Sequence, residues 1–190
     1  MAAMEPIRDK NMLRKMANYY LERGKFRNYA MFVMGACTAL RISDLLNLRW
    51  EQVYDEVRQE YRDCITLQER KTGKSKTVAL NRQAVEALKL YHQKTRGEFI
   101  FSNHRRKEGP ISRVQAWRIV RTAAQAVGAG DNIGCHSLRK TWGYHAWVDQ
   151  NISPVVIMQI FNHSSFQVTK RYLGVEQDEL NRAYLSMELF

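Results

Sequence analysis

The sequence has few cysteines, and no two of them are spaced as a pair. Cys37, Cys64 and Cys135 stand far apart in the 190 residues and form no Cys-x-x-Cys motif. Neither a disulfide framework nor a cysteine-based metal site is therefore expected. We expect reduced thiols, with Cys37 and Cys64 packed in the core. Cys135 lies beside His136, but the arginine and tyrosine pattern described below disfavours it as a nucleophile.

Several other signals are also missing. No stretch reaches eighteen apolar residues and the N-terminus has no signal-peptide core, so we expect a cytoplasmic protein with no membrane contact. Neither a P-loop nor a Gly-x-Gly-x-x-Gly motif occurs, which leaves nucleotide binding without support. No acidic cluster suggests a metal site. We therefore expect no metal and no other cofactor.

Negative charge is scarce relative to positive charge. The chain has 30 Lys and Arg against 19 Asp and Glu, a formal net charge of +11. A surplus of this size favours a polyanionic partner, with nucleic acid foremost. Acidic lipid is less favoured because no basic amphipathic segment occurs. A merely basic protein without such a partner is the remaining alternative.

The pattern of apolar residues predicts an α+β domain that is mostly helical, with one small antiparallel sheet. Capping residues and periodicity predict helices at residues 6–23, 26–37, 44–48, 81–94, 112–127, 137–148 and 176–188, with further helices starting at Ser153–Pro154 and Ser164. Gly24 is placed to end the first helix, and Ser43 to cap the short one. Residues 61–68 and 75–80 predict strands around a turn at 71–74, and residues 98–101 a short strand or loop. Without alternating strands and helices, a doubly wound fold is not expected.

The residues that could carry chemistry gather in the last third of the chain. His136, Arg139, His163 and Tyr172 follow one another there, and Arg41 lies far upstream. Arginine grips phosphate oxygens bidentately, histidine moves protons near neutrality, and tyrosine can act as a covalent nucleophile. A single His-x-x-Arg is weak evidence, because such pairs usually form a solvated helix face. The ordered combination instead indicates metal-independent attack on a phosphodiester.

These residues stand in motifs that resemble the catalytic domain of the tyrosine recombinases, the phage-integrase family. Residues 39–48 resemble the arginine box of the family, and residues 136–142 resemble its second box. His163 and Tyr172, nine positions apart, resemble its histidine and nucleophile. The resemblance extends from about residue 25 to residue 172. It implies the fold of these DNA breaking–rejoining enzymes, for which we expect a three-stranded antiparallel sheet.

The resemblance also implies a role for each residue. Arg41 and Arg139 would neutralise the charge that builds up on the phosphate, His163 would donate a hydrogen bond to it, and His136 would accept the proton of Tyr172. Attack by Tyr172 would leave a covalent 3′-phosphotyrosine, so that rejoining needs neither ATP nor metal. The alternative for Arg41 is a surface ion pair with Asp44, and for either histidine a structural role.

A lysine on the hairpin would supply the proton of the leaving 5′-oxygen. Counting back from residues 78–80, the resemblance places this general acid at Lys71, while Lys74 and Lys76 compete with it. The simpler interpretation of all three lysines is that they contact DNA phosphates from a solvated turn. The predicted DNA-binding residues are Lys74, Lys76, Arg105, Arg106, Arg113 and Lys140.

Some features depart from the family pattern. Asn162 stands where glycine usually precedes the motif histidine, a mild change because asparagine tolerates left-handed backbone geometry. Lys140 stands where a histidine often occurs. We expect the N-terminal core-binding domain of the family to be absent and residues 1–190 to form a single catalytic domain, whether a fragment or a natural minimal recombinase. We divide it into a leading helix at 1–24, a core at 25–175 and a tail at 176–190.

The acidic tail could pack on its own domain or be exchanged onto a neighbouring subunit, as the family does. The expected partner is double-stranded DNA, bound by a tetramer of subunits that are monomers in solution, in the cytoplasm of a bacterium or phage host. We predict a site-specific recombinase or integrase of a mobile element. The alternatives are a type IB topoisomerase-like enzyme and an inert DNA-binding protein. The sequence does not specify the DNA site, because recognition is spread over base contacts and DNA shape. It also does not specify whether the task is integration, excision or dimer resolution.

Overall fold

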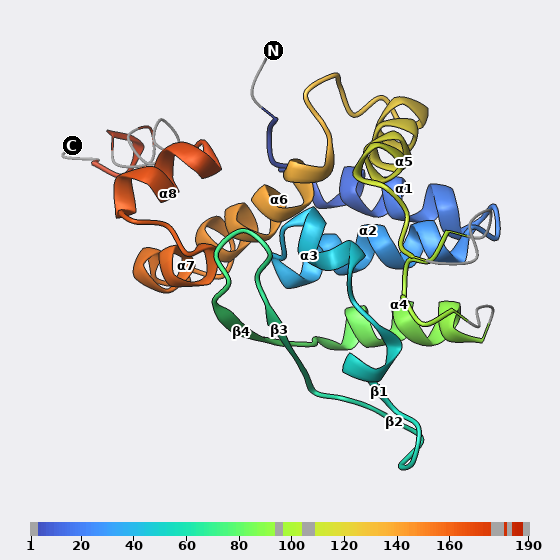
Figure 1. Ribbon diagram of the computed structural model, residues 1–190. Helices are drawn as coiled ribbons and strands as arrows, with labels where there is room; N and C mark the ends of the chain where they lie inside the picture. Colours follow the sequence, from blue (N-terminus) through green and yellow to red (C-terminus); the bar gives the residue numbers. More distant parts are fainter. Residues whose placement is uncertain (1–3, 94–96, 104–108, 176–180, 182–183, 188–190) are drawn as a thin grey trace.

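The chain folds into a helical body from which two β-hairpins extend (Figure 1). This computed structural model describes residues 4–93, 97–103, 109–175, 181 and 184–187. The helices are α1 (Lys10–Leu21), α2 (Phe26–Thr38), α3 (Ile42–Leu46), α4 (Arg82–His92), α5 (Arg113–Ala126), α6 (Cys135–Val148), α7 (Pro154–Phe161) and α8 (Phe166–Leu173), with a short 3-10 helix η1 (Trp50–Gln52). The strands are β1 (Tyr54–Asp55), β2 (Glu60–Tyr61), β3 (Cys64–Gln68) and β4 (Ser75–Ala79). The predicted α+β, mostly helical class is confirmed.

Several helix ends lie where their capping residues predict them. The Asn81 side chain accepts a hydrogen bond from the Ala84 amide at 2.9 Å and starts α4, and Ser112 starts α5 in the same way. Gly24, with φ +62°, follows the end of α1, as expected of a residue without a β-carbon. At its other end, α1 begins at Lys10 rather than at residue 6, because Asp9 is its cap.

Three serines do not have the capping positions predicted for them. The helix α3 begins before Ser43, with Arg41 in extended geometry as its N-cap. Ser137 lies inside the first turn of α6, where its hydroxyl accepts a hydrogen bond from the Gly134 amide at 3.1 Å. The cap of α8 is Ser165, whose extended backbone directs its hydroxyl to the Val168 amide, and not Ser164. Capping needs this extended geometry, which sequence spacing alone does not specify.

In the described residues the strands form two separate ladders instead of the three-stranded sheet we predicted. The strands β1 and β2 pair through Tyr54↔Tyr61, and β3 and β4 pair in register from Cys64↔Ala79 to Gln68↔Ser75. A bend at residues 62–63 separates β2 from β3. The amide of Arg62 donates to the carbonyl of Val53, next to β1, whereas the carbonyl of Asp63 accepts from the amide of Leu80, next to β4. Cys64 is exposed on β3, so its predicted burial is wrong, and Cys37 is half-buried.

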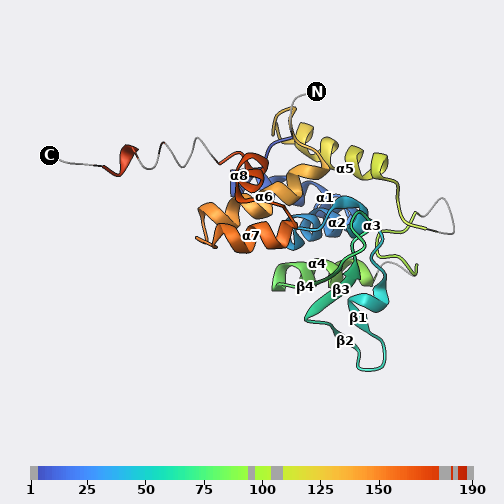
Figure 2. The ribbon, with the colours of Figure 1, turned by 60° about the vertical axis from the view of Figure 1, so that its left-hand side comes forward.

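Two apolar clusters make up the core, and α6 takes part in both. The larger cluster packs α1, α2, α4 and α5 together and includes Leu138 of α6. The smaller cluster packs α7 and α8 against the other half of α6, through Trp147, Phe161 and Leu173. Figure 2 shows α6 and α7 side by side, with α8 next to α6 and the β3–β4 hairpin turned toward α3. None of the described helices is long and apolar enough to cross a membrane. The predicted helix at 176–188 lies largely outside the described residues.

Gly143 allows α7 and α8 to approach α6 closely, and its replacement tests this packing. A β-carbon at this position would lie 2.6 Å from Leu173 Cδ2 and 2.6 Å from Phe161 Cζ, both on fully buried side chains. We therefore expect Gly143→Ala to lower the free energy of unfolding by about 1–3 kcal/mol, the usual effect of overpacking. Urea unfolding measures the change, and an unaltered midpoint would contradict the packing described here.

Candidate active site

The carboxyl end of α7 is the centre around which the candidate site is built. Its last four carbonyls have no partner within the helix, as at any helix end. The amides of Asn162 and His163 satisfy two of them, because Asn162 takes a left-handed conformation with φ +53°. The side chains of Lys76 and Arg139 satisfy the other two. Two cations from other parts of the chain thus meet the negative end of the helix dipole.

Arg139 is buried although it carries a charge. The residue is 4% exposed, and its guanidinium donates to the carbonyl of Ala39 and, at 2.9 Å, to that of Phe161. The guanidinium also lies 4.5 Å from the centre of the Phe161 ring. Burial lowers the pKa of Arg139, and the neighbouring Arg41 adds to this effect. The side chain therefore joins α6 to the ends of α2 and α7 in one orientation.

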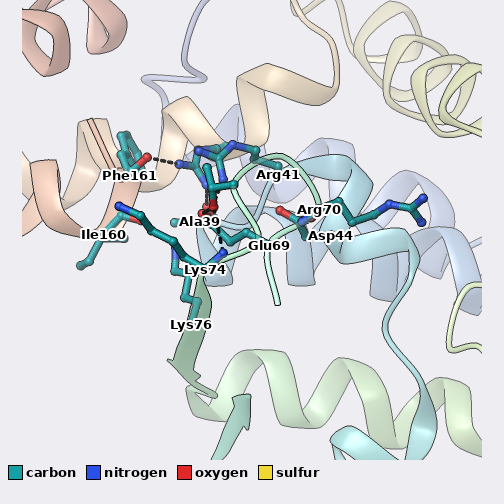
Figure 3. Close-up of polar contacts among 11 residues, drawn as sticks. Ala39, Arg41, Asp44, Glu69, Arg70, Lys74, Lys76, Ile160 and Phe161 are labelled. Atoms are coloured by element: carbon teal, nitrogen blue, oxygen red, sulfur yellow. Dashed lines mark hydrogen bonds and ion pairs between the residues drawn. The ribbon is translucent and has the colours of Figure 1, made fainter. Parts of the chain in front are cut away.

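Arg41 lies at the start of α3, close to Arg139, and its ion-pair partner is Glu69. Its Nη1 is 2.6 Å from Glu69 Oε1 (Figure 3). The alternative pair with Asp44 does not form: Asp44 Oδ1 accepts from the Arg70 amide at 3.0 Å, and its buried Oδ2 has no hydrogen-bond partner among the described residues. Both Arg41 and Arg139 affect the pKa values of His163 and Tyr172, which places all four groups in one electrostatic environment.

The β3–β4 hairpin brings Lys76 into this environment, and Lys71 stays outside it. Lys76 is half-buried, and its Nζ donates to the carbonyl of Ile160 at 2.6 Å (Figure 3). Burial lowers the pKa of Lys76 to about 8, and the charge of Arg139 contributes. Lys71 and Lys74 are exposed in the turn. Side chains alternate between the two faces of a strand, and Lys76 lies on the face of β4 that is turned toward the site.

His163 and Tyr172 contact each other across the loop between α7 and α8. Their rings are 5.0 Å apart, and Nδ1 of His163 is 3.1 Å from the buried hydroxyl of Thr169. Burial lowers the pKa of His163 to about 4, with the charges of Arg139 and Arg41 acting in the same direction. The imidazole is therefore neutral near pH 7 and has one N–H to donate.

The phenol of Tyr172 is held against cationic groups. Burial raises the pKa of Tyr172 above its usual value, and the nearby positive charges of Arg139 and Arg41 offset only part of this rise. Nζ of Lys140 lies 4.9 Å from the centre of the ring. A phenol flanked by fixed positive charges loses its proton more readily than burial alone would allow. The cationic groups thus offset part of the cost that burial imposes on the ionised phenol.

His136 lies in the first turn of α6, at the edge of the same site. The residue is open to solvent on one side, while partial desolvation of its ring, followed by the charges of Arg139 and Lys140, lowers the pKa of His136. Among the predicted DNA contacts, Arg113 is exposed at the start of α5. Arg105 and Arg106 lie outside the described residues.

The sequence pattern missed two residues that contact the site. Glu69 is a buried acid next to the predicted turn. The only signal for it in the sequence is that it is an acidic residue directly before a basic hairpin. Thr169 stands one helical turn before Tyr172, which is the only signal for its contact with His163. Within the described ranges, no three His, Cys, Asp or Glu residues come together as metal ligands would.

Comparison with known proteins identifies the family of this chain. The profile described as "Phage integrase family" matches residues 7–179. The probable integrase/recombinase YoeC of Bacillus subtilis is 36% identical over 186 residues, which cover 97% of each chain. Tyrosine recombinase XerA of Pyrococcus furiosus is 25% identical over 166 residues, 86% of this chain and 55% of XerA.

Solved structures show the same fold. A crystal structure of XerA recombinase superimposes with a TM-score of 0.73 at 20% identity, covering 96% of this chain and 63% of that one. A lambda integrase dimer bound to a COC′ core site gives 0.68 at 18% identity, covering 91% and 49%. The fold is thus that of a tyrosine recombinase catalytic domain. The chain belongs to the phage integrase family, as the motifs predicted.

Replacement of Arg139 by lysine tests whether the guanidinium has a structural role as well. A lysine has no planar fork with which to reach both carbonyls, so one acceptor would stay buried without a partner. We expect Arg139→Lys to lower the free energy of unfolding by about 1–3 kcal/mol. Arg49→Lys, in the more exposed pair with Glu98, is the matched control and should change stability little. Urea unfolding that finds equal stability in both variants would contradict this role.

Proposed function

We propose that the chain is a site-specific DNA recombinase or integrase that cuts a strand by attack of Tyr172 on a phosphodiester. One observation carries the proposal. Arg41, Arg139, His163 and Tyr172, which come from three distant parts of the sequence, share one environment at the end of α7. Cationic and neutral donors around one phenol are what stabilisation of a phosphoryl transition state requires.

In the proposed reaction, the oxygen of Tyr172 forms a bond to phosphorus and the bond from phosphorus to the 5′-oxygen breaks. Arg41 and Arg139 hold the non-bridging oxygens, and His163, which is neutral near pH 7, donates its N–H to one of them. His136 accepts the proton of the phenol. A 5′-hydroxyl then attacks the phosphotyrosine in the reverse sense, so that the energy of the broken bond is retained and no ATP is consumed.

A hairpin lysine is proposed to protonate the leaving 5′-oxygen. Lys76 has the contacts that support this role, because its ammonium lies beside the end of α7 and close to Arg139. Its lowered pKa, about 8, matches the task of an acid working near neutral pH. Lys71 is the candidate from the family resemblance, and it needs a movement of the exposed turn to reach the same place.

The proposed partner is double-stranded DNA. The net charge of +11 and the exposed Lys74 and Arg113 support contact with its backbone. We propose that a tetramer acts on DNA in the cytoplasm, that residues 1–190 form one catalytic domain, and that the tail from residue 176 packs on a neighbouring subunit. Tyr184, Leu185 and Met187 of this tail are largely exposed, which supports such packing. A topoisomerase is not favoured, since the curated relatives named above are an integrase/recombinase and a tyrosine recombinase.

Detection of a covalent adduct tests the proposed reaction. A pool of nicked duplexes with a randomised core is incubated with the protein, and adducts that survive detergent are recovered and sequenced. Tyr172→Phe should abolish the adduct, because phenylalanine has no nucleophilic oxygen. Arg41→Ala and Arg139→Ala should slow its formation by about 10²–10³-fold, as loss of one oxyanion donor does. Tyr184→Phe is the matched control, and loss of the adduct in that variant instead would refute the assignment of Tyr172.

The pH dependence of adduct formation distinguishes the two candidate lysines. If Lys76 donates the proton, the rate at subsaturating protein should fall as the pH rises through about 8, since the ammonium is then lost. Lys76→Ala should remove this fall and slow cleavage by about 10²–10⁴-fold. A 5′-bridging sulfur, which leaves without a proton, should restore the rate of that variant. Restoration in Lys71→Ala instead would assign the role to Lys71.

A further inference from the structure

Glu69 is a buried carboxylate inside the candidate phosphate site, and the reaction described above gives it no role. It follows β3 directly and is 3% exposed. The positive charges of Arg41 and Lys76 lower its pKa together with a hydrogen bond from Thr72, against the effect of burial. Glu69 therefore stays ionised at neutral pH, and an anion lies where the reaction needs cations.

Both carboxylate oxygens of Glu69 are held by specific partners. Oε1 accepts from Arg41 Nη1 at 2.6 Å, and Oε2 accepts from Thr72 Oγ1 at 2.8 Å. The backbone carbonyl of Glu69 accepts from the amide of Gly73 at 2.7 Å, which closes the turn around the side chain. Figure 3 shows Glu69 between the β3–β4 turn and Arg41. The contact is thus built into the hairpin and is more than a chance pairing of surface charges.

A carboxylate and a phosphate make the same demand on an arginine. The carboxylate is planar and the phosphate is tetrahedral, but both accept charge-assisted hydrogen bonds from the guanidinium group. A phosphate that binds Arg41 while Glu69 keeps its place would lie next to a buried negative charge, and like charges repel strongly where water is excluded. The two anions therefore compete for Arg41.

We propose that Glu69 is an internal counter-ion that takes the place of the DNA phosphate on Arg41 in the free protein and gives up this contact when the DNA backbone binds. The step is an exchange of one anion for another on Arg41, and no covalent bond changes. The proposal deepens the proposed function and rests on it for the identity of the phosphate. Its consequence is that contact with DNA has to displace Glu69 before Arg41 can act, which weakens binding to any backbone that cannot do so.

The opposite role for Glu69 would be to orient Arg41 for the phosphate. The two roles predict changes of opposite sign. Removal of a competing anion should strengthen phosphate binding, whereas removal of an orienting group should weaken it. Both roles predict a loss of thermal stability, because the buried pair contributes to folding. Stability and anion affinity thus have to be measured together.

The test compares Glu69→Gln with the wild-type protein. Glutamine keeps the shape of the side chain and an oxygen that accepts from Arg41, but removes the charge. We expect a lower melting temperature without added anion and a larger rise in melting temperature on addition of sodium sulfate, which serves as the probe. Affinity for a labelled duplex, measured by fluorescence anisotropy, should increase about two- to fivefold, the scale of one screened charge pair.

Glu98→Gln is the matched control. It removes one negative charge from the more exposed pair with Arg49, so it changes the net charge equally outside the site. Its sulfate response should equal that of the wild type. Thr72→Val provides a second variant, which leaves the charge but frees Oε2, and it should strengthen sulfate binding by a smaller factor.

Each outcome decides the proposal. If Glu69→Gln and Thr72→Val bind sulfate and DNA no more tightly than Glu98→Gln, the proposal is wrong, and weaker binding would assign Glu69 to the orientation of Arg41. The sulfate measurement does not depend on catalysis. Tighter sulfate binding in a protein that forms no covalent adduct would therefore refute the proposed function and support the counter-ion.

Discussion

The buried guanidinium of Arg139 is the interaction on which the rest of the structure depends. Its two carbonyl acceptors, at Ala39 and Phe161, belong to the ends of α2 and α7, and the arginine itself belongs to α6. The same α6 also takes part in both apolar clusters. Since a buried charge is tolerated only with its hydrogen bonds made, the three helix ends have one relative position. Arg41 follows Ala39 by two residues and His163 follows Phe161 by two, so their places in the site follow from this contact.

The site holds more positive charge than it can neutralise by itself. Arg41, Arg139 and Lys76 lie near one another, and each of the first two depresses the pKa of His163. Cations in such proximity raise the energy of the anion-free state, and a bound phosphate relieves it. The groups that offset this charge include the carbonyl of Ala39, the carbonyls at the end of α7 and the carboxylate of Glu69. Packing between distant segments thus holds these three cationic groups close together.

Much of the fold could be predicted because its signals are local. Asn81 and Ser112 cap their helices within three residues, and Gly24 follows the end of α1. Ser43 and Ser164 are not the caps that we predicted. The N-caps are Arg41 and Ser165, because the backbone is extended at those two residues. The break between the two ladders at residues 62–63 depends on contacts with Val53 and Leu80, which no local pattern reports.

The sequence by itself determined which kinds of group the protein has for phosphate chemistry and in which motifs they stand, because arginine, histidine and tyrosine keep their chemistry in any fold. It also determined the family, through motifs of fixed spacing. Only the tertiary structure decided which lysine of the hairpin faces the site and which acid pairs with Arg41. The strand register turns Lys76 inward, and the closed turn brings Glu69 rather than Asp44 to the guanidinium. Such choices arise from packing between segments that are far apart in sequence, where local propensity has no influence.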